Sequence, residues 1–337
     1  MTTNRGTLLA VCDARIHRYG DPPNAIDQVL KRSFDNGRIW EPIKVIADYP
    51  DMASACDPCL LVDRHTGRNL GFHMYCPNGI GTREAQPGLT GRTTFLHTRW
   101  SDDDGQSWSA PRDLNREVKP PTWRVFYQGP GRGIQMRDGR LVVPCTGNEI
   151  QKQTSHIVYS EDHGKTWLRG SSPSGFLTNE SQIVELTDGS LMMNMRSVHG
   201  LYQRAVAVTK DLGCSWTPLA HDSTLVEPIC QASIIRYTDR RDGYTKDRLL
   251  FSNPANKDRR RIKMTVRISY DEGKTWPVKK LIDSGKTAYS CLTVLSDGTI
   301  GLLYERGEQH AAQRIAFARF NLEWLSEGKD ELKKMLP

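Results

Sequence analysis

The chain has 337 residues, of which 37% are hydrophobic and 25% are charged, so it can form a folded core and is not a disordered protein. No apolar run approaches the roughly 18 residues that a membrane-spanning helix needs, which excludes a helical membrane protein. The formal net charge of +7 suits an anionic ligand, although scattered Lys and Arg are also typical of an ordinary solvated surface.

The N-terminal segment, residues 1–12, contains an apolar stretch too short for the core of a signal peptide. We expect no export signal there, and the compartment stays open. The eight cysteines are spread thinly, mostly in apolar strand-like runs where a free thiol behaves as a small hydrophobe. Cys56 and Cys59 form the one C-x-x-C pair, and no second pair completes a zinc site. We expect no metal, no cofactor and no dependence on disulfides.

One eight-residue pattern, Ser/Thr-x-Asp-x-Gly-x-Ser/Thr-Trp, occurs four times, and a fifth copy deviates at Ile39. The copies, here called Asp boxes, begin at Ser33, Ser101, Ser160, Thr209 and Ser269. In a tight β-hairpin the Asp accepts hydrogen bonds from turn amides, the Gly supplies a positive φ, and the Trp packs back as an anchor. We therefore interpret the box aspartates as structural, not catalytic.

Around the Asp boxes the same order of short strand-like runs recurs. They include DPCLLVD, NLGFHMYC and TTFLHTRWS; GRLVVPC and SHIVYS; SQIVEL, SLMMNMRS and RAVAVT; ASIIRY, RLLFSN and KMTVRIS; and YSCLTVL, TIGLLYERG and RIAFARF. Boxes spaced by 49 to 68 residues are typical of propeller blades. We predict an all-β fold, a six-bladed β-propeller of four-stranded antiparallel blades with Asp-box hairpins. It forms a single domain over residues 1–337, and residues 326–336 are expected to form a short helix.

The first blade is predicted to lack its innermost strand. In the fourth and sixth blades the first strand begins about eight residues before an Asp-Gly turn, the usual punctuation of a hairpin. In the first blade the corresponding turn is residues 4–6, so most of that strand would fall before Met1.

The same Asp-Gly turns indicate where unusual side chains gather at the mouth of the propeller. Positions eight residues before and after the turn of the fourth blade are Glu180 and Arg196. In the sixth blade they are Tyr289 and Glu305. Residues symmetric about a hairpin turn lie opposite each other, so each pair should be neighbours. These residues are candidates for an active site, and satisfied surface salt bridges are the alternative.

Together these features resemble the exo-sialidase (neuraminidase) family of six-bladed propellers, from about Gly6 to Phe320. The resemblance is carried by the Asp boxes, the CDAR segment ending at Arg15, the segment GDPPNAIDQVLKRS, NESQIVEL, LMMNMR, RIKMTVRIS and AYSCL. It implies a retaining glycoside hydrolase that releases terminal sialic acid from sialylated glycans or glycoconjugates. Most glycoside hydrolases use a pair of carboxylates, and sialidases are an exception because their nucleophile is a tyrosine.

The resemblance also implies roles for single residues. Tyr289 matches the nucleophile, and Glu180 matches the base that removes its proton, since a phenol with a pKa near 10 is otherwise a poor nucleophile. Asp21 in the GDPP loop matches the acid/base that protonates the leaving oxygen, and Asp27 is the alternative. Asp57 is expected to line the pocket.

The substrate carboxylate is held by three arginines in this family, because guanidinium offers paired donors to carboxylate oxygens. Arg196 and Arg261 match two of them, and Arg15 matches a further arginine on the far side of the sugar ring. The third would fall before Met1, so Glu305, which matches its usual partner, is expected to lack that contact. Losing one such contact costs on the order of 2–5 kcal/mol, which predicts a weakened or inactive enzyme unless another cation substitutes.

Two other function classes stay open at this point. One is a sialic-acid-binding, lectin-like propeller without catalysis, and the other is a purely structural propeller. No basic patch with interleaved aromatic residues indicates nucleic acid as a partner. The oligomeric state stays open.

Overall fold

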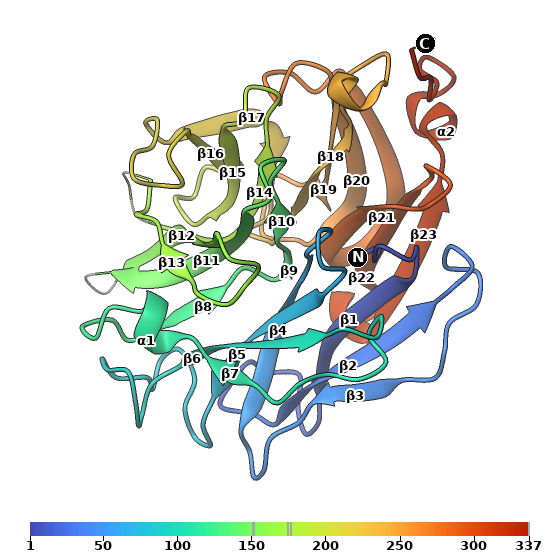
Figure 1. Ribbon diagram of the computed structural model, residues 1–337. Helices are drawn as coiled ribbons and strands as arrows, with labels where there is room; N and C mark the ends of the chain where they lie inside the picture. The colour runs from blue at the N-terminus through green and yellow to red at the C-terminus, as the bar shows by residue number, and fades with distance from the viewer. Residues whose placement is uncertain (150–151, 174, 176, 336–337) are drawn as a thin grey trace.

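The computed structural model describes residues 1–149, 152–173, 175 and 177–335, and most of its regular structure is β-strand. The strands form sheets that follow one another around a ring, from blue through green and yellow to red (Figure 1). None of the helices in the described ranges is long and apolar enough to span a membrane. Because the strands make up most of the regular structure, the all-β prediction is confirmed.

The first two sheets take up the N-terminal half of the chain. The first contains β1 (Leu8–Arg15), β2 (Ile26–Ser33), β3 (Lys44–Ala47), β4 (Ser54–Val62), β5 (Asn69–Cys76), β6 (Phe95–Ser101), β7 (Arg112–Asp113) and β9 (Gly131–Arg132). The second contains β8 (Phe126–Gln128), β10 (Ile134–Gln135), β11 (Leu141–Glu149), β12 (Lys152–Ser160) and β13 (Leu168–Arg169).

The third and fourth sheets take up the C-terminal half. The third contains β14 (Thr178–Glu185), β15 (Leu191–Ser197), β16 (Gln203–Thr209) and β17 (Ala220–Val226). The fourth contains β18 (Ser233–Thr238), β19 (Arg248–Pro254), β20 (Ile262–Ser269), β21 (Val278–Val294), β22 (Ile300–Gly307) and β23 (Arg314–Phe320). The helices are α1 (Asn115–Val118), α2 (Leu322–Ser326) and two 3-10 turns, η1 (Arg240–Asp242) and η2 (Ala311–Gln313).

Most neighbouring strands within each sheet pair antiparallel, as the recurring runs predict, whereas β4 pairs in parallel with β2 and with β9. The third sheet is the simplest case, because β14, β15, β16 and β17 lie in sequence order. Strand β21 pairs with β20 through its first half and with β22 through its second half, which joins two antiparallel runs. The ring closes where Thr2 Oγ1 meets Thr293 Oγ1 at 2.8 Å and donates to Val294 O at 2.7 Å, beside the label N in Figure 1.

The Asp boxes form the turns that the sequence predicts. In the third box the Thr166 amide and hydroxyl donate to the Asp162 carboxylate at 2.9 and 2.6 Å. The Gly164 amide donates to Ser160 Oγ at 2.8 Å, and Gly164 has a φ of 83°, which favours glycine. The same contact from a turn amide recurs at Asp35, Asp103, Asp211 and Asp271. The structural interpretation of the box aspartates is confirmed.

The apolar core lies between neighbouring sheets. One cluster joins Leu70 and Phe72 of β5 to Val143 of β11 and Val158 of β12. A second joins β11 and β12 to β14 and β15, and a third joins β14 and β15 to β18 and β19. Since each sheet buries its faces against the next sheets of the ring, the centre is left for polar side chains.

The C-terminal helix lies ahead of its predicted position. The helix α2 ends at Ser326, and residues 327–335 are not helical, so the prediction of a helix over residues 326–336 is wrong for its described part. The Asn321 side chain caps the start of α2 by accepting the Trp324 amide at 2.9 Å. Glu327 takes the left-handed conformation with a φ of 57°, and Gly328 follows, which ends the helix.

Candidate active site

A cavity of about 1230 Å³ lies at the centre of the ring. Strands β1, β4, β14, β15, β21 and β22 and the loops beside them contribute its lining. The lining includes all eight residues that the sequence predicts for the site, Arg15, Asp21, Asp57, Glu180, Arg196, Arg261, Tyr289 and Glu305. The alternative to Asp21, Asp27, instead lies within β2.

Tyr289, Glu180 and Arg196 contact one another at the centre of this cavity. The Tyr289 hydroxyl donates a short hydrogen bond to Glu180 Oε1. Arg196 Nη1 lies 2.7 Å from Glu180 Oε2 and 3.4 Å from the Tyr289 hydroxyl oxygen. The spacing of the Asp-Gly turns predicts the Glu180–Arg196 contact, which is confirmed.

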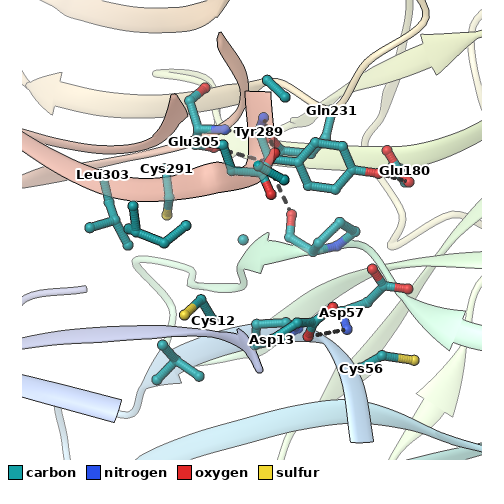
Figure 2. Close-up of a pocket in the computed structure, with 18 of the residues that line it drawn as sticks. Cys12, Asp13, Cys56, Asp57, Glu180, Gln231, Tyr289, Cys291, Leu303 and Glu305 are labelled. Carbon is teal, nitrogen blue, oxygen red and sulfur yellow. Dashed lines mark hydrogen bonds between the residues drawn. The ribbon is translucent and has the colours of Figure 1, made fainter. Parts of the chain in front are cut away.

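Glu305 and Arg261 lie on either side of Tyr289. Glu305 Oε2 accepts the Tyr289 backbone amide at 3.0 Å, which confirms the second predicted neighbour pair. The Arg261 guanidinium lies 5.6 Å from the centroid of the Tyr289 ring, and its Nη2 donates to Ile229 O at 3.0 Å. Figure 2 shows Tyr289, Glu180 and Glu305 together on one side of the cavity.

Two carboxylates face this group from the other side of the cavity (Figure 2). Asp13 Oδ1 accepts the backbone amide of Asp57 at 3.1 Å. Gln128 Nε2 donates to Asp57 O, which ties the second sheet to this point. Asp13 is a cavity residue that the sequence prediction missed, although it lies two positions before Arg15 on the same strand and therefore on the same face.

Arg15 connects this carboxylate pair to the loop between β1 and β2. Its Nη2 lies 2.9 Å from Asp21 Oδ1 and 3.9 Å from Asp13 Oδ2. The Asp21 side chain is 83% exposed, whereas that of Asp13 is 16% exposed. Asp21 thus stands at the rim of the cavity and Asp13 in its wall.

Three β-bulges direct three of these side chains toward the centre of the ring. Between Cys56 and Cys59 in β4, between Thr178 and Ser181 in β14, and between Thr287 and Ser290 in β21, the strand holds one residue more than its partner. Asp57, Glu180 and Tyr289 lie within these three β-bulges. A bulge bends a strand and re-aims a side chain, so side chains from three sheets converge.

Burial sets the ionisation of the site. It raises the pKa of Tyr289 well above 10, and the Glu180 charge raises it further while Arg196 opposes the shift. Burial also raises the pKa of Asp57 well above its usual range and the pKa of Asp13 to about 7. The Tyr289 phenol is therefore neutral, and its O–H is directed at Glu180 Oε1. In this arrangement a carboxylate can act as a general base.

Among the described residues, no group of three or more His, Cys, Asp or Glu side chains could hold a metal ion. The side chains that meet in the cavity include a phenol, carboxylates and guanidinium groups. Two guanidinium groups beside this phenol suit a ligand that carries a carboxylate.

The chain matches the model of a known family, described as a BNR repeat-like domain, over residues 6–302. It is 38% identical to a sialidase of Bacteroides fragilis (strain YCH46) over 329 residues, which cover 92% of this chain and 59% of that protein. It is 30% identical to an exo-alpha-sialidase of Arthroderma benhamiae over 363 residues, which cover 97% of this chain and 83% of that protein.

Among solved structures, the chain is similar to the Hadza microbial sialidase Hz136, with a TM-score of 0.89 and 37% identity. That match covers 96% of this chain and 65% of the other. The chain thus spans somewhat more than half the length of the bacterial relative and about two thirds of the solved one.

Proposed function

This chain belongs to the sialidase family, and from that premise we propose that it is an exo-alpha-sialidase that releases terminal sialic acid from sialylated glycans. The observation that carries the proposal is the contact of the Tyr289 hydroxyl with Glu180, with Arg196 bound to both. A merely structural propeller has no need of a partly buried phenol hydrogen-bonded to a carboxylate at its centre.

The proposed reaction begins with the substrate carboxylate on Arg196 and Arg261. Guanidinium groups bind carboxylate oxygens with paired donors, which fixes the anomeric carbon near Tyr289. This carbon already carries a carboxylate, so an anionic nucleophile would be repelled and a neutral phenol is the better choice. The resting neutrality of Tyr289, whose pKa is raised by burial, agrees with this requirement.

The proton transfers follow from the contacts of each side chain. The Tyr289 oxygen forms a bond to the anomeric carbon while its proton passes to Glu180, and the bond to the leaving oxygen breaks. Asp21, at the rim, protonates the leaving oxygen and then accepts a proton from the water that attacks the anomeric carbon. In that second step the bond between this carbon and the Tyr289 oxygen breaks, and Glu180 returns the proton to the phenol. Two displacements at one carbon give a product with retained configuration. Arg15 positions Asp21 through their 2.9 Å contact.

We also propose that the ring has six blades in one domain over residues 1–337. The four strands of the third sheet support a four-stranded blade, and β21 supports a boundary between two blades within the fourth sheet. In the proposed first blade, β1, β2 and β3 form a run of three antiparallel strands, and residues 1–3 pair briefly with the start of β1 on its other side.

A sialic-acid-binding protein without catalysis is not favoured, because the nucleophile, its base and Arg196 are assembled. The weakening expected from an absent third arginine stays a prediction. Burial raises the pKa of Glu305, whereas the Tyr289 amide and the charges of Arg261 and Arg15 lower it. Arg261 already binds the substrate carboxylate in this proposal, so Arg15 is the remaining cation of the two that would compensate for that arginine.

Hydrolysis of an aryl α-sialoside followed by NMR tests the proposal. We expect release of sialic acid, with the α-anomer as the first product before mutarotation. A β-anomer as the first product would contradict the tyrosine mechanism. Binding of the sialoside without any hydrolysis by the wild-type protein would contradict the enzyme and favour the lectin-like alternative.

A further inference from the structure

Two exposed rings lie side by side at the rim of the cavity and have no role in the proposed reaction. Tyr19 lies in the loop between β1 and β2, and His310 lies in the loop between β22 and β23. Their ring centroids are 5.9 Å apart and their planes differ by 30°. Both rings line the cavity, and Tyr19 is 77% exposed. An aromatic side chain this exposed contributes little to the core.

The backbone around Tyr19 is nevertheless held in place. Arg15 Nη1 donates to the Tyr19 carbonyl, and the same guanidinium pairs with Asp21. The fully buried Asn24 donates to the carbonyls of Arg18 at 2.9 Å and Gly20 at 3.0 Å. The loop thus presents the Tyr19 ring to solvent at a fixed place beside Asp21.

The loop of His310 is fixed in a comparable way. Gln313 Oε1 accepts the amides of Glu308 at 2.7 Å and Gln309 at 2.9 Å. His310 Nδ1 accepts the Ala312 amide at 3.2 Å. In a neutral imidazole whose Nδ1 is an acceptor, the proton is on Nε2, so His310 offers an N–H donor as well as a ring face.

We propose that Tyr19 and His310 form a shelf that binds the sugar to which the sialic acid is attached. The inference rests on the proposed function, because Asp21 protonates the leaving oxygen and that oxygen belongs to the second sugar. Asp21 is two residues from Tyr19 and shares its contact with Arg15, so the second sugar lies on this side of the cavity.

The occupant is a neutral pyranose. The apolar face of a pyranose packs on an aromatic ring, with its C–H bonds directed at the π-face, and its hydroxyl groups accept a hydrogen bond such as that from His310 Nε2. With centroids 5.9 Å apart and positions on two separate loops, the two rings are close enough to contact one sugar between the rim and the cavity that binds the charged sialic acid in this proposal.

The experiment compares a ligand that has the second sugar with one that lacks it. Dissociation constants of sialyllactose and of free sialic acid are measured by calorimetry on Tyr289→Phe, so that no turnover interferes. Adding Tyr19→Ala or His310→Ala should weaken sialyllactose about 3- to 10-fold, the size expected for one lost ring contact, and leave free sialic acid unchanged. Tyr19→Phe, which keeps the ring, should bind sialyllactose as before.

Phe34→Ala is the matched control, since Phe34 is an exposed ring (63%) on the first Asp box, and it should change neither constant. Equal binding of sialyllactose with and without both rings would overturn the shelf, as would an equal loss for both ligands. The proposed function fails separately, by the absence of sialoside hydrolysis in the wild-type chain. Even then, the ratio of the dissociation constants of sialyllactose and free sialic acid still tests whether the shelf binds the second sugar.

Discussion

The aspartates of the Asp boxes and Asp13 in the central cavity carry the same chemical group, but their pKa values are shifted in opposite directions. Burial acts to raise the pKa of Asp162, but the hydrogen bonds from Thr166 and Ser160 outweigh it and lower the pKa to about 2. For Asp13, burial dominates and raises the pKa to about 7. The boxes are conspicuous and repeated, yet their carboxylates are fully occupied by their own turns.

Burial and the number of hydrogen-bond donors together explain this difference, since burial is the largest cause of the Asp13 shift. Asp162 accepts the Thr166 amide, the Thr166 hydroxyl and the Ser160 hydroxyl. Asp13 accepts one amide at 3.1 Å, and the Arg15 guanidinium lies 3.9 Å away. A carboxylate whose lone pairs are already used stabilises the fold, whereas one with capacity left can bind the hydroxyl groups of a ligand.

The largest expected effect comes from Tyr289→Phe. Without the nucleophilic oxygen, kcat on an aryl sialoside should fall about 10³-fold or more, because the covalent route is lost. Glu180 keeps its contact with Arg196 in this variant, so the melting temperature should stay near that of the wild type. Steady-state kinetics and thermal unfolding check both. A fall in kcat of the same size in Asp162→Asn would contradict the distinction between the Asp boxes and the central cavity.

A smaller loss is expected for Glu180→Gln. The amide keeps the shape of the side chain but cannot take the phenol proton, so kcat should fall about 10²- to 10³-fold. The variant also leaves the partly buried Arg196 without its anionic partner, which should lower thermal stability. Unchanged kcat at neutral pH would show that Glu180 is not the base.

The pH dependence of stability tests Asp13. Its pKa of about 7 in the folded protein exceeds the ordinary value of 3.8, so between these values folding favours the protonated acid. Stability contributed by this group is complete below about pH 4 and is lost as pH rises through about 7. Asp13→Asn still accepts the Asp57 amide and cannot ionise, so it should melt higher than the wild type at about pH 8 and equally at about pH 4. A lower melting temperature on the alkaline side would contradict the raised pKa.

The smallest effect on activity is expected for Asp162→Asn. Its folded pKa of about 2 lies below the ordinary value of 3.8, so its contribution to stability is present above about pH 4 and is lost as pH falls to about 2. Weaker bonds to the turn should cost about 1 kcal/mol of unfolding free energy at neutral pH. Chemical denaturation checks the stability, and kcat/KM should match the wild type. A tenfold loss of kcat/KM would give the boxes a role in catalysis.

The Asp boxes could be predicted from the sequence because each turn is local, with donor and acceptor within four residues. The Glu180–Arg196 and Tyr289–Glu305 pairs could be predicted because each joins two strands of one hairpin. Contacts between sheets, such as that of Tyr289 with Glu180, followed from the family resemblance and not from spacing. Asp13 was missed, although the alternation of β1 places it on the same face as Arg15, because Arg15 was identified from the family resemblance and not from that alternation. The bulges themselves could not be predicted, since nothing in a period-2 pattern marks an inserted residue.

The three bulges have a consequence for how this ring could change over time. Deleting one residue between Thr178 and Ser181 would restore the even alternation of β14 and turn a side chain outward, while the hairpin ladder beside it stays paired. A single-codon insertion or deletion at a bulge could thus add or remove one side chain of the site. The sheets and the side chains of the site could therefore change independently during evolution.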